Sequence, residues 1–273
     1  MQEQKQAGLL ARMKWHPSFL VANTVIMCFL IIVGSSALLQ IGRAHASSRV
    51  SSSNSGIMNA VVYDVTHNRY YTYYPSGLFT VASSMKVPIM LTFFDEIERE
   101  GRGITSYEWW LLTTMIENSN NNSASALYYG EIGGAVGVAS YMQRLGITGL
   151  YPDPYAWGWS VIAPWTMVNL LTFLYEGHIL TAYHRSLAFY LMEHVEADQR
   201  VGVGDTAPRG ATVAMKDGWV PAPDGLWAMN SSGIVMVDGE TYIIAVYTKD
   251  NSSLWAGQNT VRQLCSMVAS MLR

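Results

Sequence analysis

Strand-like patterns occur near both ends of the chain. The stretch Ile57–Val65 is rich in β-branched and aromatic residues, and turn-forming residues 66–68 separate it from a second such stretch, Tyr70–Tyr74. These segments predict a β-hairpin. Three more candidate strands follow near the C-terminus, over Ala211–Trp219, Ala228–Val237 and Thr241–Thr248. Asp238-Gly239, between the last two, is a strong signal for a two-residue hairpin turn.

The middle of the chain has the apolar spacing of helices. One helix is predicted from Ser84 to Glu100, because Gly101 then supplies a stop signal. Ser106 is expected to cap the next helix, which runs through Glu117. Further helices are predicted over Asn122–Tyr129, Val136–Leu145, Pro164–Glu176, Thr181–Glu196 and Trp255–Leu272.

The order of these elements is strands, then helices, then strands and a closing helix. That order predicts an α+β fold in which an antiparallel five-stranded sheet is built from both ends of the chain. Helices are expected to flank the sheet, and the middle of the chain is expected to form an inserted helical subdomain.

The N-terminal region has the features of a membrane segment. Lys5, Arg12 and Lys14 precede an uncharged stretch, Phe19–Ile41, which exceeds the ~20 residues needed to span a bilayer. The basic flank predicts a cytoplasmic N-terminus and an exported C-terminal part. Ala44-His45-Ala46 offers the alternative of a cleaved signal peptide. We expect an uncleaved anchor, because the apolar stretch is longer than the ~7–15 residues of a signal-peptide core.

We therefore divide the chain into four segments. Residues 1–16 are expected to be cytoplasmic, 17–42 to be the transmembrane signal anchor or signal peptide, 43–55 to be a serine-rich linker, and 56–273 to be the folded domain. The domain would then lie outside the cytoplasm, either tethered by a single membrane pass or secreted if the chain is cut near Ala46.

Composition narrows the classes of function. Hydrophobic residues make up 50 % of the chain and charged residues 14 %, so a sizeable core can form. A formal net charge of −3 argues against nucleic-acid binding. The histidines are scattered, and Cys28 and Cys265 lack the paired spacing of metal ligands. We expect no metal, no cofactor and a monomer.

Three short polar motifs follow one another along the chain. Ser83-Ser84-Met85-Lys86 is an S-x-x-K, Ser119-Asn120-Asn121 is an S-x-N, and Lys216-Asp217-Gly218 is a K-x-G. Taken singly, they could be a helix surface pair, a capping cluster and a turn. Their order and their predicted helix and strand contexts favour a single catalytic site.

The first motif has the parts of an activated nucleophile. A spacing of three residues on a helix brings Lys86 to the face that carries Ser83. A buried lysine can be neutral enough to take the hydroxyl proton of the serine. Ser83 would lie at a helix N-terminus, where free N–H groups favour negative charge. The N–H groups of Ser83 and Trp219 are candidates for an oxyanion hole.

The other two motifs would line the rest of the cleft. Ser119 can relay a proton to the leaving group, and Asn121 can hydrogen-bond a substrate amide. The charge of Lys216 suits a substrate carboxylate. Gly218 would let the substrate backbone approach closely. Asp217 is the remaining candidate for substrate binding.

The residues around the motifs resemble class A β-lactamases. FTVASSMKVPIM resembles their nucleophile segment, MIENSNNNSASAL their S-D-N segment, and PRGATVAMKDGW their K-T-G strand. The resemblance extends over about residues 56–273. It implies the fold shared by serine β-lactamases and penicillin-binding D,D-peptidases, an acyl-enzyme intermediate, and an extracytoplasmic location.

The chain departs from this family at two positions. The family's loop glutamate, which activates the deacylating water, has no counterpart in Leu150–Met167, where Asp153 is the only acid. We therefore expect slow deacylation, with Asp153 as either a substitute base or a turn-stabilising residue. Asp217 replaces the usual threonine or serine, and it would repel a substrate carboxylate unless it pairs with Lys216 or Arg209.

Three other residues are candidates for the cleft. Glu117 could be a further acid or a solvated residue at a helix end. Trp157 and Trp159 could line the cleft or pack in the core. The function predicted from all this is a serine hydrolase that acylates with β-lactam or peptidoglycan-peptide-like D-alanyl amide substrates and deacylates slowly. The alternative is a catalytically weak, membrane-tethered cell-wall-binding module of the same fold.

Overall fold

The computed structural model describes residues 56–74 and 76–272. The predicted cytoplasmic segment (1–16), anchor or signal peptide (17–42) and linker (43–55) lie outside the described residues. Within the described ranges, no helix combines the length and the apolar character that crossing a membrane requires.

A five-stranded antiparallel sheet forms the centre of the domain, in the order β2-β1-β8-β7-β6. The strands are β1 (Ile57–Asp64), β2 (Arg69–Tyr73), β6 (Thr212–Pro221), β7 (Trp227–Val237) and β8 (Glu240–Asn251). Because β1 pairs with β8, the N-terminal hairpin and the C-terminal strands belong to one sheet, as the order of elements predicted.

The turn between β7 and β8 shows why that hairpin could be predicted locally. Asp238 and Gly239 have φ values of 52° and 84°. Two successive residues with positive φ match the right-handed twist of paired strands, and aspartate and glycine adopt this conformation readily. Val237 then pairs with Glu240, so the turn sets the register of the hairpin.

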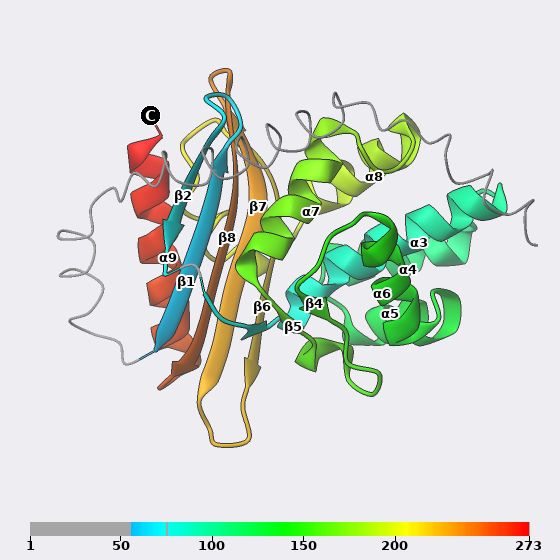
Figure 1. The fold of residues 1–273 in the computed structure, drawn as a ribbon, viewed down its shortest axis with the longest axis horizontal. Helices are drawn as coiled ribbons and strands as arrows, with labels where there is room; N and C mark the ends of the chain where they lie inside the picture. Colours follow the sequence, from blue (N-terminus) through cyan, green and yellow to red (C-terminus); the bar gives the residue numbers. More distant parts are fainter. Residues whose placement is uncertain (1–55, 75, 273) are drawn as a thin grey trace, which may run out of the picture. The chain divides into compact units, whose positions relative to one another are not determined.

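Helices cover both faces of the sheet (Figure 1). Helix α9 (Leu254–Met271) packs on β7 and β8 on one face, and α7 (Pro164–Glu176) packs on β8 and β1 on the other. Neighbouring residues of β8 alternate between these two cores: Ile244 belongs to the core under α9, and Ile243 to the core under α7. This alternation follows from the two-residue period of a strand.

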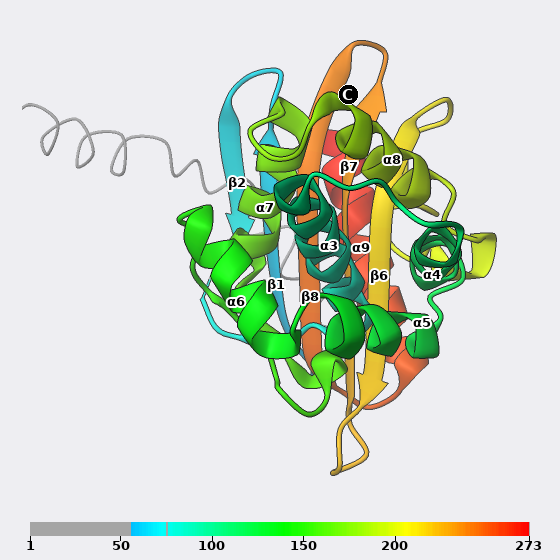
Figure 2. The same cartoon turned by 90° about the vertical axis from the view of Figure 1, so that its right-hand side faces the viewer.

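The inserted helical subdomain lies on the α7 side of the sheet (Figure 2). Its helices are α3 (Lys86–Glu100), α4 (Ser106–Ile116), α5 (Asn121–Ser125), the π-helix η4 (Ala126–Glu131), α6 (Gly134–Arg144) and α8 (Ala182–Glu193). The predicted helix to Glu196 therefore ends earlier, and a short 3-10 turn, η6 (Ala197–Gln199), follows it.

The N-cap of α4 is Thr105, and the prediction of Ser106 was wrong by one residue. The Thr105 hydroxyl accepts from the Glu108 N–H at 3.2 Å, and the Glu108 carboxylate accepts from the Thr105 N–H at 2.7 Å. This reciprocal capping box satisfies two backbone donors at the helix start. Ser106 has no acid at the matching offset, since the residue three places later is Trp109.

A second, small sheet was not predicted. It contains β3 (Phe79–Thr80), β4 (Leu150–Tyr151) and β5 (Val161–Ile162), in the order β3-β5-β4. Two-residue strands are too short to show a period in the sequence. This sheet ties the loop between β4 and β5 to the segment before Ser83, and the Val81 N–H continues the link by donating to Ser160 O at 2.9 Å.

Candidate active site

Ser83 lies in the 3-10 turn η3 (Ala82–Met85), immediately before α3. Ala82, the residue before it, has a φ of 48°, which is unfavourable for a residue with a Cβ. Such conformations persist where the surrounding structure holds them, commonly at functional sites. Ser83 is half-buried at the end of this constrained turn, so its hydroxyl is presented at a defined position.

Asn230 of β7 holds the turn in place. Its side-chain Nδ2 donates to Val81 O at 2.9 Å and to Thr80 O at 3.2 Å, and its Oδ1 accepts from the Ser84 hydroxyl. Asn230 is 1 % exposed, so these bonds are made in the interior. The sequence analysis missed this positioning residue. The available signal was a run of three polar residues, Asn230-Ser231-Ser232, inside a strand whose two ends are apolar.

The side chain of Lys86 connects the first two motifs. Its Nζ lies 2.9 Å from Ser83 Oγ and 2.8 Å from Asn121 Oδ1. It also lies 2.6 Å from Ser119 O and 2.9 Å from Ser119 Oγ. Lys86 is fully buried. Four residues predicted from two separate motifs therefore meet around one nitrogen atom.

Burial changes the acid–base chemistry of Lys86. Desolvation, reinforced by the nearby charge of Lys216, lowers the pKa of Lys86 to about 6, while Asp217 opposes part of this effect. The amine is therefore mostly neutral at pH 7. A neutral amine can accept a proton, which an ammonium group cannot do.

The contacts of Lys86 favour one orientation of a neutral amine, which has two N–H groups and one lone pair. Ser119 O and Asn121 Oδ1 can only accept hydrogen bonds, so they hold the two N–H groups. The lone pair is then left for a hydroxyl. The hydroxyls of Ser83 and Ser119, each 2.9 Å from Nζ, are both able to donate to the lone pair of the neutral amine.

The loop between α4 and α5 presents the second motif. Ser119 has a φ of 56°, and the Asn120 N–H donates to Thr114 O at 2.9 Å. The side chain of Asn120 caps α5 by accepting from the Ser123 N–H, also at 2.9 Å. The middle residue of the motif therefore fixes the loop, and the outer two residues reach Lys86.

The third motif contains one of the two pairings that the sequence left open for Asp217. Lys216 Nζ donates to Asp217 Oδ1 at 3.1 Å and to Asp217 O at 3.2 Å, and both side chains are completely buried. The second carboxylate oxygen of Asp217 accepts from the Val201 N–H at 3.1 Å. Of the two partners considered for Asp217, Lys216 is therefore the one that it contacts. Among the described residues, Arg209 forms no hydrogen bond or ion pair with Asp217.

Gly218 is required by the protein's own packing. A Cβ at this position would lie 2.6 Å from Ser83 N and 2.8 Å from Ser84 N. The edge strand β6 and the turn η3 can approach this closely only because Gly218 has no side chain. Trp219 follows on the same edge strand, and its N–H as an oxyanion-hole donor together with Ser83 N–H stays a prediction.

The two loop tryptophans differ in position. Trp157, in the 3-10 turn η5 (Trp157–Trp159), is 9 % exposed, and its ring centroid lies 5.0 Å from Lys86 Nζ. Its Nε1 donates to Ser125 Oγ at 3.0 Å. Trp159 is 40 % exposed. Trp157 thus borders the Lys86 nitrogen, and Trp159 lies at the surface.

Neither candidate acid is hydrogen-bonded to Lys86 among the described residues. Asp153 Oδ1 accepts from the N–H groups of Tyr155 and Ala156, at 2.8 and 2.7 Å, so it stabilises the loop in the manner of an Asx turn. Glu117 ends α4, and its carbonyl accepts from Glu196 N at 3.0 Å. Desolvation raises the pKa of Glu117, but no hydrogen bond joins it to Lys86 among the described residues.

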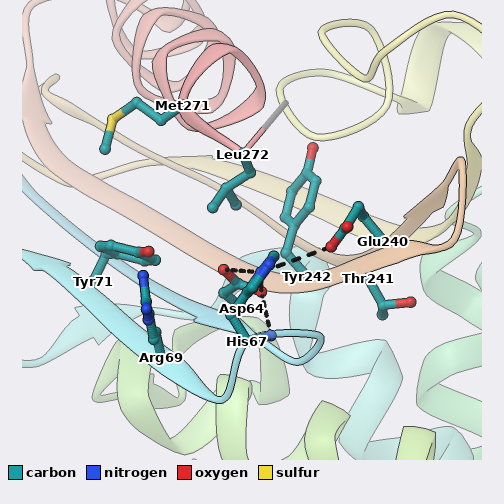
Figure 3. A pocket seen from close by; sticks show the side chains of 9 residues that line it. All are labelled: Asp64, His67, Arg69, Tyr71, Glu240, Thr241, Tyr242, Met271 and Leu272. Atoms are coloured by element: carbon teal, nitrogen blue, oxygen red, sulfur yellow. Dashed lines mark hydrogen bonds and ion pairs between the residues drawn. The ribbon is translucent and has the colours of Figure 1, made fainter.

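One group of potential metal ligands lies elsewhere (Figure 3). Ligand atoms of Asp64, His67 and Glu240 lie within 4.8 Å of one another in a pocket that also contains Arg69. His67 Nδ1 is 3.1 Å from both carboxylate oxygens of Asp64, and its backbone N–H donates to Asp64 Oδ1. The group is thus already internally hydrogen-bonded, and none of the predicted catalytic residues belongs to it.

The fold and the cluster define a class of protein: an α+β domain with a serine–lysine site between a sheet edge and a helical subdomain. The model of the Beta-lactamase enzyme family matches residues 43–272, and the chain belongs to this family. No curated protein sequence gives a significant match.

Solved structures with the same fold include both β-lactamases and a protein titled PBP-A. The extended-spectrum β-lactamase TLA-3 is similar with a TM-score of 0.75 at 17 % identity, covering 83 % of this chain and 98 % of TLA-3. A class A β-lactamase from Bacteroides cellulosilyticus gives 0.71 at 17 %, with coverages of 82 % and 94 %. PBP-A gives 0.73 at 18 %, with 83 % and 93 %.

Proposed function

We propose that the protein is a serine hydrolase that forms an acyl-enzyme on Ser83 with β-lactam or D-alanyl amide substrates and releases the acyl group slowly. The contacts at Lys86 Nζ support this proposal most strongly. A buried amine with a pKa of about 6, held 2.9 Å from a serine hydroxyl, is suited to act as a general base at neutral pH.

Acylation would use the cluster as follows. Lys86 takes the proton of Ser83 while Oγ attacks the substrate carbonyl carbon. The C–N bond of the amide then breaks, and the departing nitrogen receives a proton. Ser119 Oγ, 2.9 Å from Lys86 Nζ, can pass that proton on from the new ammonium group. The serine is left as an ester, and the catalytic amine is again neutral.

Hydrolysis of that ester requires an activated water. In the loop between β4 and β5, the only carboxylate is Asp153, and one of its oxygens is engaged by two backbone N–H groups. The ring of Trp157, and no acid of this loop, adjoins Lys86. Because a positioned general base contributes about 10²–10⁴-fold, we expect deacylation to be at least about 100-fold slower than it would be with such a base, so that the acyl-enzyme accumulates.

Intact-protein mass spectrometry after incubation with benzylpenicillin tests this proposal. The expected result is a persistent mass increase of one drug molecule in the wild type and none in Ser83→Ala. Asp153→Asn is expected to leave drug turnover unchanged. Asparagine keeps the Oδ1 acceptor that stabilises the loop, and the lost charge has no proposed role in turnover. A transient adduct with rapid drug hydrolysis, lost in Asp153→Asn, would establish Asp153 as the deacylation base.

A folded protein that neither forms an adduct nor hydrolyses the drug would contradict acylation by β-lactams. That result would favour the non-catalytic cell-wall-binding module. The intact contacts among Ser83, Lys86, Ser119 and Asn121 are the reason that we rank the enzyme above this alternative.

A further inference from the structure

The charge at the third motif is compensated inside the protein. Lys216 and Asp217 are adjacent on β6, both fully buried, and joined by a 3.1 Å ion pair. Burial lowers the pKa of Lys216 and raises that of Asp217, while each group opposes the other's shift. Whether the proton resides on the amine or on the carboxyl, the pair as a whole has no net charge.

The hydrogen-bonding capacity of the pair is also directed inward. Two contacts of Lys216 Nζ go to Asp217, and Asp217 Oδ2 is held by the Val201 N–H. With no exposed surface on either side chain, Lys216 offers nothing that a ligand can touch without breaking this arrangement. A hydroxyl at position 217 would leave the lysine charge uncompensated, whereas the aspartate neutralises it.

Among the described residues, no further lysine or arginine forms a hydrogen bond or ion pair with the proposed catalytic cluster of Ser83, Lys86, Ser119 and Asn121. Lys86 is mostly neutral at pH 7, because its pKa is about 6. The remaining group with a charge effect on Lys216 is Asp198 of η6, which is negative. A substrate carboxylate entering here would lose water without gaining a cationic partner, and an unpaired charge in a poorly solvated site is strongly disfavoured.

We propose that the site prefers acyl donors whose leaving-group end carries no carboxylate, such as carboxamides and esters, and that Asp217 determines this preference by neutralising Lys216. Donors that carry a carboxylate there, such as benzylpenicillin, acylate Ser83 more slowly but still acylate it. This inference rests on the proposed acylation of Ser83. It refines the substrate class of that site: peptide-like acyl donors react faster when the group beyond the scissile bond is uncharged.

Two matched thioesters of N-benzoyl-D-alanine test it in the full-length protein, one with a mercaptoacetate leaving group and one with mercaptoacetamide. For each thioester, the rate constant for acylation of Ser83 is divided by the rate constant for its spontaneous hydrolysis. This ratio corrects for the different intrinsic reactivities of the two thioesters. We expect the wild type to prefer the carboxamide by at least about tenfold, equivalent to the loss of one good polar contact.

Variants at position 217 test whether Asp217 is the cause of this preference. Asp217→Asn keeps the shape of the side chain and removes its charge, so the preference is expected to shift towards the carboxylate by about tenfold or more. Asp217→Thr is a second, smaller replacement for the case in which the asparagine variant is unstable. Asp238→Asn is the matched control, since it removes the same charge from the exposed β7–β8 turn and is expected to leave the preference unchanged.

The outcomes separate this inference from the proposed function. If Ser83 is acylated but the wild type prefers the carboxylate, or both Asp217 variants keep the wild-type preference, the inference is wrong and the acylation mechanism stands. If neither thioester acylates Ser83, the proposed function fails, and the inference fails with it.

Discussion

At the scale of residues, the candidate site depends on the hydrogen-bond partners of one buried amine, Lys86 Nζ. Lys86 has no exposed surface, and the loss of its hydration on burial disfavours the charged form of the amine. Three polar side chains and one carbonyl around Nζ compensate for the lost hydration. The same burial lowers the pKa of Lys86 to about 6, which is the property that its proposed role as a base requires.

The pH dependence of acylation follows from this pKa. Below about pH 6 Lys86 becomes protonated and loses its lone pair, so the acylation rate constant is expected to fall about tenfold per pH unit there and to level off above pH 7. Rates of Ser83 labelling measured between about pH 4.5 and 8.5 check this.

Lys86→Arg is the informative companion variant. A guanidinium group stays protonated throughout this range, so acylation is expected to be lost at every pH. An acid limb centred above pH 8 in the wild type would contradict a neutral lysine and point to another base.

At the scale of elements, the ends of helices set the positions of the catalytic groups. The capping box of Thr105 and Glu108 begins α4, whose C-terminal end leads into the loop that carries Ser119. Glu108 is also bound by Arg102, with Nη1 to Oε1 at 2.8 Å. Arg102 is partly exposed and Glu108 is buried, so this ion pair holds the Glu108 carboxylate beside the cap.

Thr105→Ala is expected to lower the free energy of unfolding by about 1 kcal/mol, because the Glu108 N–H loses its acceptor. Ser106→Ala, at the position indicated by the sequence alone, is expected to change it by less than about 0.5 kcal/mol. Urea denaturation of both variants provides the comparison. A larger effect at Ser106 than at Thr105 would show that the cap is assigned to the wrong residue.

At the scale of the whole domain, the site exists only where the edge of the sheet meets the helical subdomain. Ser83 and Lys86 come from the start of the helical part, and Gly218 comes from β6. The close backbone approach at Gly218 and the bonds of Asn230 to the η3 segment hold these two parts together. The catalytic geometry is therefore a property of this junction.

Gly218→Ala tests the junction. The added methyl group would lie 2.6 Å from Ser83 N, so β6 and η3 must move apart. We expect Ser83 acylation to slow by at least about 100-fold, because small displacements of reacting groups have effects of that size. Overpacking should also lower stability by about 1–3 kcal/mol.

Gly103→Ala serves as its control, because nothing lies within 4 Å of the added methyl group. It should acylate like the wild type, as measured by the same mass-spectrometric assay. An active, stable Gly218→Ala protein would show that the junction tolerates expansion.

The sequence by itself determined the elements and the local chemistry of this protein. Strands and helices follow from periods of two and 3.6 residues, and the turn at Asp238-Gly239 from backbone preferences of those residues. The approach of Lys86 to Ser83 follows from helical spacing within one turn. These features depend on residues close in sequence, whose geometry is nearly independent of the rest of the chain.

The tertiary structure decided which distant groups meet. Ser119 and Asn121 reach Lys86 across 33 and 35 positions, and Asn230 reaches Ser84 across 146. The choice of Lys216 over Arg209 as the partner of Asp217 was likewise not contained in the spacing. Such contacts, and the desolvation that changes the pKa of Lys86, arise only when packing brings separate elements together and excludes water.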